Sequence, residues 1–228
     1  MNVLIERPST AILQRMPTSS SRSPAHHSSR ILRRAYTVWA PFYDAVVGAF
    51  FRESRRKSLA GLGDVSGQLI LLDGVGTGLD LPWLPPDGRY VGLDLTPAML
   101  SRARARAGRL RIHFQIGDAM ALPFRDAAFD QVVMHLILAV VPAPGAALVE
   151  AARVVRPGGR LLILDKFLRP GERAPLRRLI SPIIGRLATR TDVVLEEALA
   201  SCPELDLVSD EPDLGGGWFR RIVVRRVG

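Results

Sequence analysis

Three glycines at alternate positions, Gly74, Gly76 and Gly78, are the first residues whose spacing could support chemistry. They follow an unbroken apolar run, Leu69 to Leu72, which suits a strand buried on both faces of a parallel sheet. Glycine lets the backbone turn sharply and approach a ligand closely, because no Cβ is in the way. If a helix follows, its free N–H groups and positive end point into the turn. The pattern predicts a ligand site but does not identify the ligand.

An acidic residue ends the next expected strand. Tyr90 to Leu93 is followed by Asp94, about twenty residues after the glycines. A carboxylate at this place can accept hydrogen bonds from both ribose hydroxyls of a nucleotide. The alternative is that Asp94 only precedes the helix that Thr96 and Pro97 begin. The order and spacing favour ribose binding, although nicotinamide dehydrogenases share these features.

Further motifs follow in a fixed order. They are Gly117-Asp118-Ala119, Leu122-Pro123-Phe124, Phe129 to Val133, Arg156-Pro157-Gly158-Gly159 and an apolar strand from Leu161 to Leu164. This ordered set resembles the class I S-adenosylmethionine-dependent methyltransferases over roughly residues 65 to 228. The resemblance implies an α/β fold with a doubly wound, seven-stranded, mostly parallel Rossmann-like sheet that ends in an antiparallel hairpin. It also implies S-adenosyl-L-methionine as the cofactor.

The resemblance implies a set of residues that bind this cofactor. The glycine turn would face the methionine part, and Asp94 would bind the ribose. Asp118 would accept from the adenine amino group, and the N–H of Ala119 would face the adenine ring. These residues are Gly74, Gly76, Thr77, Gly78, Asp94, Leu95, Asp118 and Ala119.

One position departs from the family pattern. Family members usually carry an acid two residues before the first glycine, where this chain has Leu72, and here Asp73 directly precedes Gly74. Neighbouring residues of a strand point to opposite faces, so Asp73 need not replace the usual acid. Either a local bulge rotates Asp73 inward or other groups fix the methionine end. Asp73 remains a candidate cofactor-binding residue.

Residues 31–64 are expected to form two helical pieces divided by Pro41, as lid helices. Tyr36 to Asp44 resembles the Tyr-x-x-x-Ala-Pro-x-Tyr-Asp pattern at the amino terminus of bacterial phosphatidylethanolamine N-methyltransferases and, more loosely, of quinone C-methyltransferases. This resemblance implies that Tyr36 lies near the cofactor and Tyr43 near the acceptor, in a catalytic role. The second piece is either a helix docked on the sheet or a lid whose aromatic and cationic edge touches a membrane.

His135 is the second candidate catalytic residue. It follows the apolar run Val132 to Met134, at the strand end where ligands gather in α/β sheets. A histidine there can act as a base or contact the methionine carboxylate. The alternative is a packed histidine without a chemical role. The Asn/Asp-Pro-Pro-aromatic motif of nucleic-acid amino methyltransferases is absent after this strand, so nucleic acid is not the expected substrate.

Composition excludes several classes of protein. A single cysteine, Cys202, excludes an internal disulfide framework, and no histidine spacing indicates a metal site, so no metal is expected. No apolar run approaches the ~18 residues of a membrane-spanning helix. The net charge of +9 favours contact with anionic surfaces or acidic substrates.

The chain divides into a disordered tail, residues 1–30, and one methyltransferase domain, residues 31–228, with a basic substrate-cover insertion at 168–202. We therefore expect a cytoplasmic methyltransferase, extending to the inner membrane face, that acts on an amphipathic or membrane-associated acceptor such as a phospholipid amine headgroup. The alternative is a small-molecule substrate, soluble or quinone-like. A further alternative is a non-catalytic cofactor-binding or RNA-associated protein. The oligomeric state is not predicted.

Overall fold

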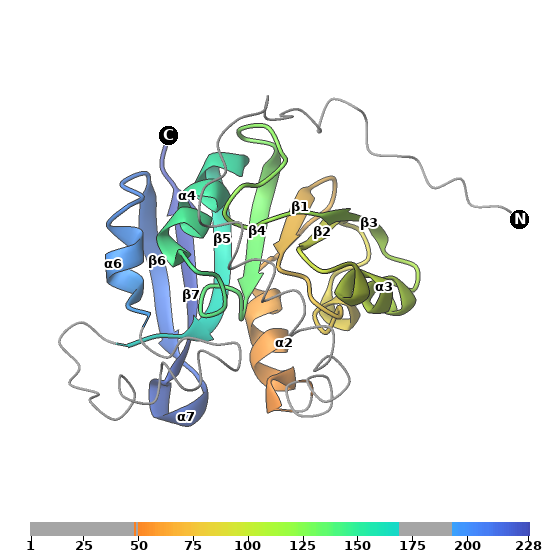
Figure 1. Cartoon of the computed structure of the whole chain (residues 1–228), viewed down its shortest axis with the longest axis horizontal. Coiled ribbons are helices and arrows are strands. Elements are labelled where there is room, and N and C mark those ends of the chain that lie inside the picture. Colours follow the sequence, from red (N-terminus) through yellow and green to blue (C-terminus); the bar gives the residue numbers. More distant parts are fainter. Residues whose placement is uncertain (1–47, 49, 169–192) are drawn as a thin grey trace, which may run out of the picture.

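The computed structural model describes residue 48, residues 50–168 and residues 193–228, and in this part of the chain seven strands form one sheet (Figure 1). The strand order is β3-β2-β1-β4-β5-β7-β6. The parallel strands are β1 (Leu69–Asp73), β2 (Arg89–Asp94), β3 (Arg111–Ile116), β4 (Phe129–His135) and β5 (Val155–Lys166). The antiparallel strands are β6 (Leu205–Pro212) and β7 (Phe219–Arg226). This topology confirms the predicted doubly wound sheet and its final hairpin.

Helices cover both faces of the sheet. Leu71 of β1 belongs to the apolar cluster that includes α4 (Pro144–Val154) and α6 (Leu195–Leu199). Its neighbours Ile70 and Leu72 belong to the cluster of the other face. That cluster contains residues of α2 (Arg52–Ala60) and α3 (Pro97–Arg106). The unbroken apolar run of β1 follows from this arrangement, because side chains on both faces of a central strand are buried.

The glycine-rich turn is not followed by an α-helix. A single 3-10 turn, η2 (Leu81–Trp83), leads toward β2 instead. Pro82, Pro85 and Pro86 lie in this connection, and proline lacks the N–H that a helix interior requires. The N–H groups that face the turn therefore belong to the turn itself, and a long helix dipole does not act on it.

The carboxyl ends of the parallel strands meet at one edge of the sheet, which we call the carboxyl edge. α2 and α7 (Leu214–Gly217) both lie toward this edge (Figure 1). The register of β5 with β7 pairs Lys166 with Phe219, so the start of β7 also lies there. Among the described residues, no helix is long and apolar enough to cross a bilayer.

Several predicted features fall outside the described residues. They include the tail at 1–30, residues 31–47 and 49 of the lid, and residues 169–192 of the insertion. Tyr36 and Tyr43 are among them, so their assignments and the domain boundaries stay predictions.

Candidate active site

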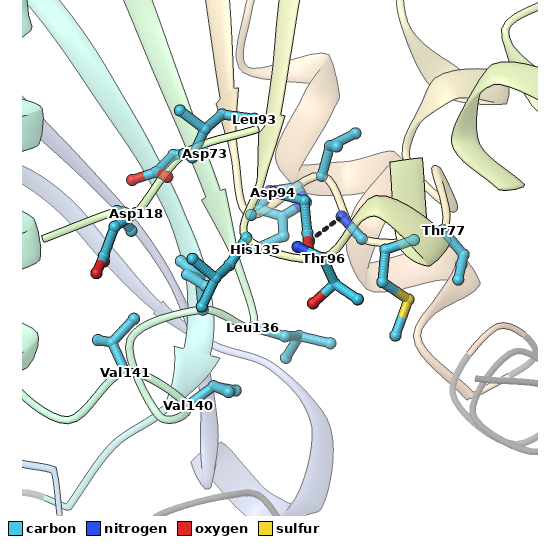
Figure 2. A pocket seen from close by; sticks show the side chains of 18 of the residues that line it. Asp73, Thr77, Leu93, Asp94, Thr96, Asp118, His135, Leu136, Val140 and Val141 are labelled. Carbon is cyan, nitrogen blue, oxygen red and sulfur yellow. Dashed lines mark hydrogen bonds between the residues drawn. The ribbon is translucent and has the colours of Figure 1, made fainter. Parts of the chain in front are cut away.

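A pocket of about 950 Å³, counting its open mouth, lies at the carboxyl edge. The glycine-rich turn, the end of β2, the loop after β3 and the segment after β4 line it, together with one residue of α2. Every lining residue falls between Arg55 and Pro142. The position is where ligands bind in open α/β sheets. Figure 2 shows the side chains that surround it.

The glycine turn needs glycine for two separate reasons. Gly74, Gly76 and Gly78 all have positive φ, from 55° to 84°, a region that residues with a Cβ rarely adopt. A Cβ at Gly74 would also lie 2.8 Å from Cδ1 of Ile137. A Cβ at Gly78 would lie 3.0 Å from Cα of Ala103 in α3. The turn is therefore closely packed against both the segment after β4 and the helix after β2.

Asp94 ties the end of β2 to this turn. Its Oδ2 accepts a hydrogen bond from the backbone N–H of Gly76 at 3.0 Å, the dashed line in Figure 2. Its Oδ1 accepts from the N–H of Thr96, the N-cap residue of α3, at 2.7 Å. Burial raises the pKa of Asp94, and these two hydrogen bonds oppose that rise. Each carboxylate oxygen keeps a further lone pair, so both bonds leave room for ribose hydroxyls.

The other residues expected at the nucleoside end also line the pocket. Oδ1 of Asp118 accepts from the N–H of Met120 at 2.9 Å. Ala119 is buried, and Leu95 is half-buried at the start of the loop after β2. Thr77 lies in the turn, where its carbonyl oxygen accepts from Nη1 of Arg106 at 2.6 Å. The structure thus brings the predicted residues of this region around a single pocket.

Asp73 is a buried acid with no hydrogen-bond partner among the described residues. It is one of the residues that line the pocket, its exposed fraction is 1%, and both carboxyl oxygens are buried. Leu72 remains in the apolar cluster of the opposite face, as strand alternation requires. The chain is locally irregular just after Asp73, because the N–H groups of Gly74 and Val75 both donate to the carbonyl of Leu93. Burial, followed by the charges of Asp94, Asp118 and Glu150, raises the pKa of Asp73 to about 8.

His135 belongs to a buried polar network that the sequence did not predict. Its Nδ1 lies 2.9 Å from Oδ1 of Asp80, and its Nε2 lies 2.9 Å from Oγ of Ser58. The same Asp80 oxygen accepts from Nη1 of Arg55 at 2.7 Å. All four side chains are buried. Burial opposes ionisation of Asp80, but the charges of Arg55 and His135 and their hydrogen bonds hold its pKa well below the ordinary value.

This network limits what His135 can do as it stands. Asp80 is ionised and accepts only, so Nδ1 of His135 is the protonated nitrogen in this pair. The other nitrogen is engaged with Ser58. A base at His135 would first have to give up that contact, so the catalytic role of His135 stays a prediction. The geometry itself connects α2 to the pocket wall.

The segment after β4 is held by Asp165 at the end of β5. Oδ2 of Asp165 accepts from the N–H of Ala139 at 3.0 Å, and Oδ1 accepts from the N–H of Lys166. Burial raises the pKa of Asp165 to about 6, with these bonds and the charge of Lys166 opposing the rise. Leu136, which lines the pocket, has a φ of 59°. Asp165 therefore uses its hydrogen bonds to position the segment that forms this wall of the pocket.

Sequence reasoning missed Arg55, Ser58 and Asp80. Arg55 is one of four cations between Arg52 and Lys57, yet it is buried, whereas Arg56 and Lys57 are exposed and pair with Glu53. The available signal was periodicity: Arg55 shares the buried side of α2 with Ser58 and Leu59. Among the described residues, no group of three metal-ligating side chains lies together.

Comparisons with known proteins agree with this geometry. Residues 71–163 match the family described as "Methyltransferase domain". The chain is 33% identical to a phosphatidylethanolamine N-methyltransferase from Cereibacter sphaeroides over 191 residues, which cover 82% of this chain and 93% of that protein. The chain belongs to the class I S-adenosylmethionine-dependent methyltransferases.

This methyltransferase is also similar to a quinone methyltransferase in sequence and to a solved methyltransferase in structure. It is 32% identical to a demethylmenaquinone methyltransferase from Tropheryma whipplei over 183 residues, 75% of this chain and 74% of that protein. A solved S-adenosylmethionine-dependent methyltransferase from Thermotoga maritima, described as a possible histamine N-methyltransferase, superimposes with a TM-score of 0.65. That similarity covers 85% of this chain and 99% of the other at 20% identity, so it supports the fold alone.

The residues at the pocket of this methyltransferase fit S-adenosylmethionine. The glycine turn has no side chains that would fill the space beside Ile137, and each carboxylate oxygen of Asp94 keeps a lone pair for a further hydrogen bond. The cofactor carries hydroxyl and amino donors and positive charge, which carboxylates can accept or balance. When bound, it supplies a methyl group on a positively charged sulfonium.

Proposed function

We propose that this methyltransferase acts on an amphipathic, membrane-associated acceptor, and that a phospholipid amine headgroup is the substrate. The supporting observation is the similarity to the Cereibacter sphaeroides protein, which extends over nearly the whole of that phosphatidylethanolamine N-methyltransferase. It reaches beyond the cofactor pocket, into the parts of the chain that would contact an acceptor.

Within this proposal, different residues at the carboxyl edge bind different parts of the cofactor. Asp94 and Leu95 hold the ribose, and Asp118 with the N–H of Ala119 holds the adenine. The turn of Gly74, Gly76, Thr77 and Gly78 faces the methionine part. Tyr36, Tyr43 and His135 are assigned to the methionine end and the acceptor, on the sequence pattern alone for the two tyrosines.

An aromatic surface beside the pocket supports an apolar acceptor. Phe50 is 58% exposed and packs edge-on against Phe51, at 5.0 Å between ring centroids. Phe51 in turn packs on Phe219, at 4.7 Å, and Phe219 lies next to Trp218. We call these four residues the aromatic edge. Because Phe219 starts β7 opposite Lys166, the aromatic edge lies at the same end of the sheet as the pocket.

Cations accompany the aromatic edge. Arg52, Arg56 and Lys57 are exposed on α2, directly after Phe50 and Phe51. The exposed ring of Phe50 together with these cations suits the boundary of an anionic membrane, where an aromatic ring enters the headgroup layer and each cation adds roughly 1 kcal/mol near the surface. The net charge of +9 acts in the same direction.

Methyl transfer requires the protein mainly to position the acceptor next to the methyl group. The methyl group on a sulfonium is already reactive, so the gain comes from alignment of the acceptor and exclusion of water. An amine acceptor must be neutral when it attacks, because a protonated amine has no lone pair. The proton has to leave to a nearby base or to water.

A second candidate substrate is a quinone-like ring. The relative from Tropheryma whipplei is a demethylmenaquinone methyltransferase and is almost equally identical in sequence. A ring substrate with an isoprenoid tail is also amphipathic, so the aromatic edge would serve it equally. A soluble small molecule is the remaining alternative.

The experiment uses the full chain, methyl-labelled S-adenosylmethionine and two kinds of vesicle. One contains phosphatidylethanolamine with phosphatidylglycerol, and the other contains phosphatidylcholine with a demethylated menaquinone. Label in the phosphatidylethanolamine fraction is the expected result, and label in the quinone selects the second candidate. Label that appears only in water-soluble products of a cell extract would overturn the membrane assignment.

A matched pair of variants tests the aromatic edge. Phe50→Ala should lower the transfer rate on vesicles several-fold while cofactor affinity stays unchanged. Leu207→Ala removes a similarly exposed apolar side chain, 53% exposed, near the amino end of β6 and away from the pocket. That control should transfer methyl groups at the normal rate. Equal losses in both variants would contradict a specific docking role for Phe50.

A further inference from the structure

Lys166 is a half-buried cation at the end of β5 that does not line the cofactor pocket. Its backbone N–H donates to Oδ1 of Asp165, but its ammonium group has no hydrogen bond or ion pair among the described residues. Burial lowers the pKa of Lys166, and the charge of Asp165 opposes that fall. An ammonium group that has lost part of its water without gaining a protein partner is suited to bind an anion.

Strand alternation places Lys166 on the face of the sheet that α2 covers. Leu162, four residues earlier in β5, belongs to the apolar cluster that contains residues of α2. Side chains at even spacing share a face, so Lys166 lies on the side of α2 and Asp165 on the opposite side. His135 is also on the side of α2, because its Nε2 contacts Oγ of Ser58.

Lys166 lies between the cofactor pocket and the aromatic edge. His135, which lines the pocket, is in register with Leu164 of β5, so strand spacings place the Cα of Lys166 about 8 Å from the Cα of His135. On the other side, Lys166 is paired with Phe219, whose ring packs on Phe51 at 4.7 Å between centroids. A lysine side chain is long enough to span most of the distance toward the pocket.

Guanidinium groups of α2 and β7 in this part of the molecule are already bound by carboxylates of the protein. The pairs are Arg55 with Asp80, Arg220 with Asp210 and Arg221 with Glu211. Lys166 differs from these arginines. An anion from outside the protein can therefore bind its ammonium group without displacing an internal acid.

We propose that Lys166 binds the phosphate of the acceptor headgroup. This inference rests on the proposed function, since a phospholipid amine carries a phosphate and a quinone carries none. The amine has to reach the methyl group in the pocket, while the acyl chains stay in the membrane at the aromatic edge. The phosphate, which one oxygen and two carbon atoms separate from the amine, then lies between the pocket and the aromatic edge, as Lys166 does. The ammonium group of lysine is a compact charge that suits phosphate.

This contact makes Lys166 a specificity-determining residue. It favours phospholipid amines over membrane amines that lack a phosphate, and it holds the headgroup so that the amine points into the pocket. Lys166 takes no part in the transfer of the methyl group itself.

The test measures methyl transfer by the full chain to two lipids in mixed micelles of a non-ionic detergent, with saturating methyl-labelled S-adenosylmethionine. One lipid is phosphatidylethanolamine, and the other has the same acyl chains and a primary amine attached without a phosphate. The wild-type protein should act at least about tenfold faster on phosphatidylethanolamine. Lys166→Met keeps the length of the side chain and removes its charge. It should slow transfer to phosphatidylethanolamine about tenfold and change transfer to the other lipid less than twofold.

Two further variants separate phosphate binding from packing. Lys166→Arg keeps a cation and should recover most of the rate on phosphatidylethanolamine, which a loss of packing alone does not predict. Arg225→Met removes an exposed cation at the opposite end of β7 and should match the wild type on both lipids. Calorimetry should give the same affinity for S-adenosylmethionine in all three variants, because neither position lines the pocket.

Normal transfer to phosphatidylethanolamine by Lys166→Met would overturn this inference and leave the proposed function intact. Equal rates of the wild type on the two lipids, or equal slowing of both by Lys166→Met, would also overturn it, since neither result requires a phosphate contact. Absence of transfer to phosphatidylethanolamine by the wild type, in micelles and in vesicles, would instead refute the proposed function.

Discussion

Nδ1 of His135 lies 2.9 Å from Oδ1 of Asp80, although 55 residues separate them in the sequence. The contact joins the end of β4 to the segment that follows the glycine turn, and Arg55 adds α2 to the same oxygen. Three stretches of chain that border one pocket therefore meet at a single carboxylate. The position of α2 and the shape of the pocket depend on each other through Asp80.

Replacing Asp80 should destabilise the protein strongly. Asp80→Asn removes the carboxylate charge that Nη1 of Arg55 and Nδ1 of His135 contact, and removing one partner of a buried ion pair costs about 3 kcal/mol or more. The free energy of unfolding, measured in urea, is the test. Glu53→Gln breaks exposed pairs on the same helix and should change the free energy of unfolding far less, because exposed ion pairs are screened by solvent. Similar losses for the two variants would show that the buried network adds no special stability.

Gly74→Ala should reduce cofactor affinity by at least about tenfold, because the backbone strain of a positive φ is joined by a clash with Ile137. Gly158→Ala separates the two effects, since Gly158 has a φ of 75° but nothing within 4 Å of the added Cβ. It should lower stability by roughly 1 kcal/mol and leave cofactor affinity unchanged. The double variant Gly74→Ala/Ile137→Ala should recover part of the affinity. Calorimetric titration measures the affinity of each variant. No recovery of affinity in the double variant would show that the clash with Ile137 is not the cause of the loss.

The free protein should lose stability as the pH rises from about 4 to 8, and Asp73 should account for much of that loss. The pKa of Asp73 is about 8 in the folded chain against an ordinary value of 3.8, so over this range the folded state keeps a proton that the unfolded state has released. Stability is then present at low pH and lost as the pH rises through the folded pKa. Relative to Asp73→Asn, the loss is on the order of 6 kcal/mol when complete. Parallel stability–pH curves for the two proteins would refute this assignment.

Asp94→Ala should weaken cofactor binding by about tenfold to a hundredfold while the fold survives. The substitution removes the acceptor for the N–H groups of Gly76 and Thr96 together with the predicted ribose contacts, and hydrogen bonds to a charged group contribute about 1.5–3 kcal/mol each. Circular dichroism checks the fold and calorimetry measures affinity. Asp126→Asn, an exposed acid far along the chain, is the control. Unchanged affinity in Asp94→Ala would remove Asp94 from the cofactor site.

Much of the fold followed from local patterns in the sequence. The apolar run Leu69 to Leu72 predicted a central strand, and Asp94 and Asp118 predicted where neighbouring strands end. These features can be predicted from the sequence because a few consecutive residues specify a strand end or a glycine turn. Whether a helix follows the glycine turn was left open, and the connection with its three prolines contains only η2 before β2.

The buried network was not predictable in the same way. Nothing local distinguishes Arg55 from the exposed Arg52 and Arg56 on the same helix, and its partner Asp80 lies 25 residues away. Such pairs arise from the packing of α2 on the sheet, which one sequence does not specify. The face to which Asp73 points was left open for a related reason, since it depends on the backbone irregularity after β1.

Since all residues that line the pocket fall between Arg55 and Pro142, the described structure separates two tasks along the chain. In our proposal this inner stretch binds the methyl donor, and the portion after β5, including the start of β7, presents what an acceptor meets. Chimeras that exchange only the portion after β5 with that of a relative should thus change acceptor preference and keep donor affinity.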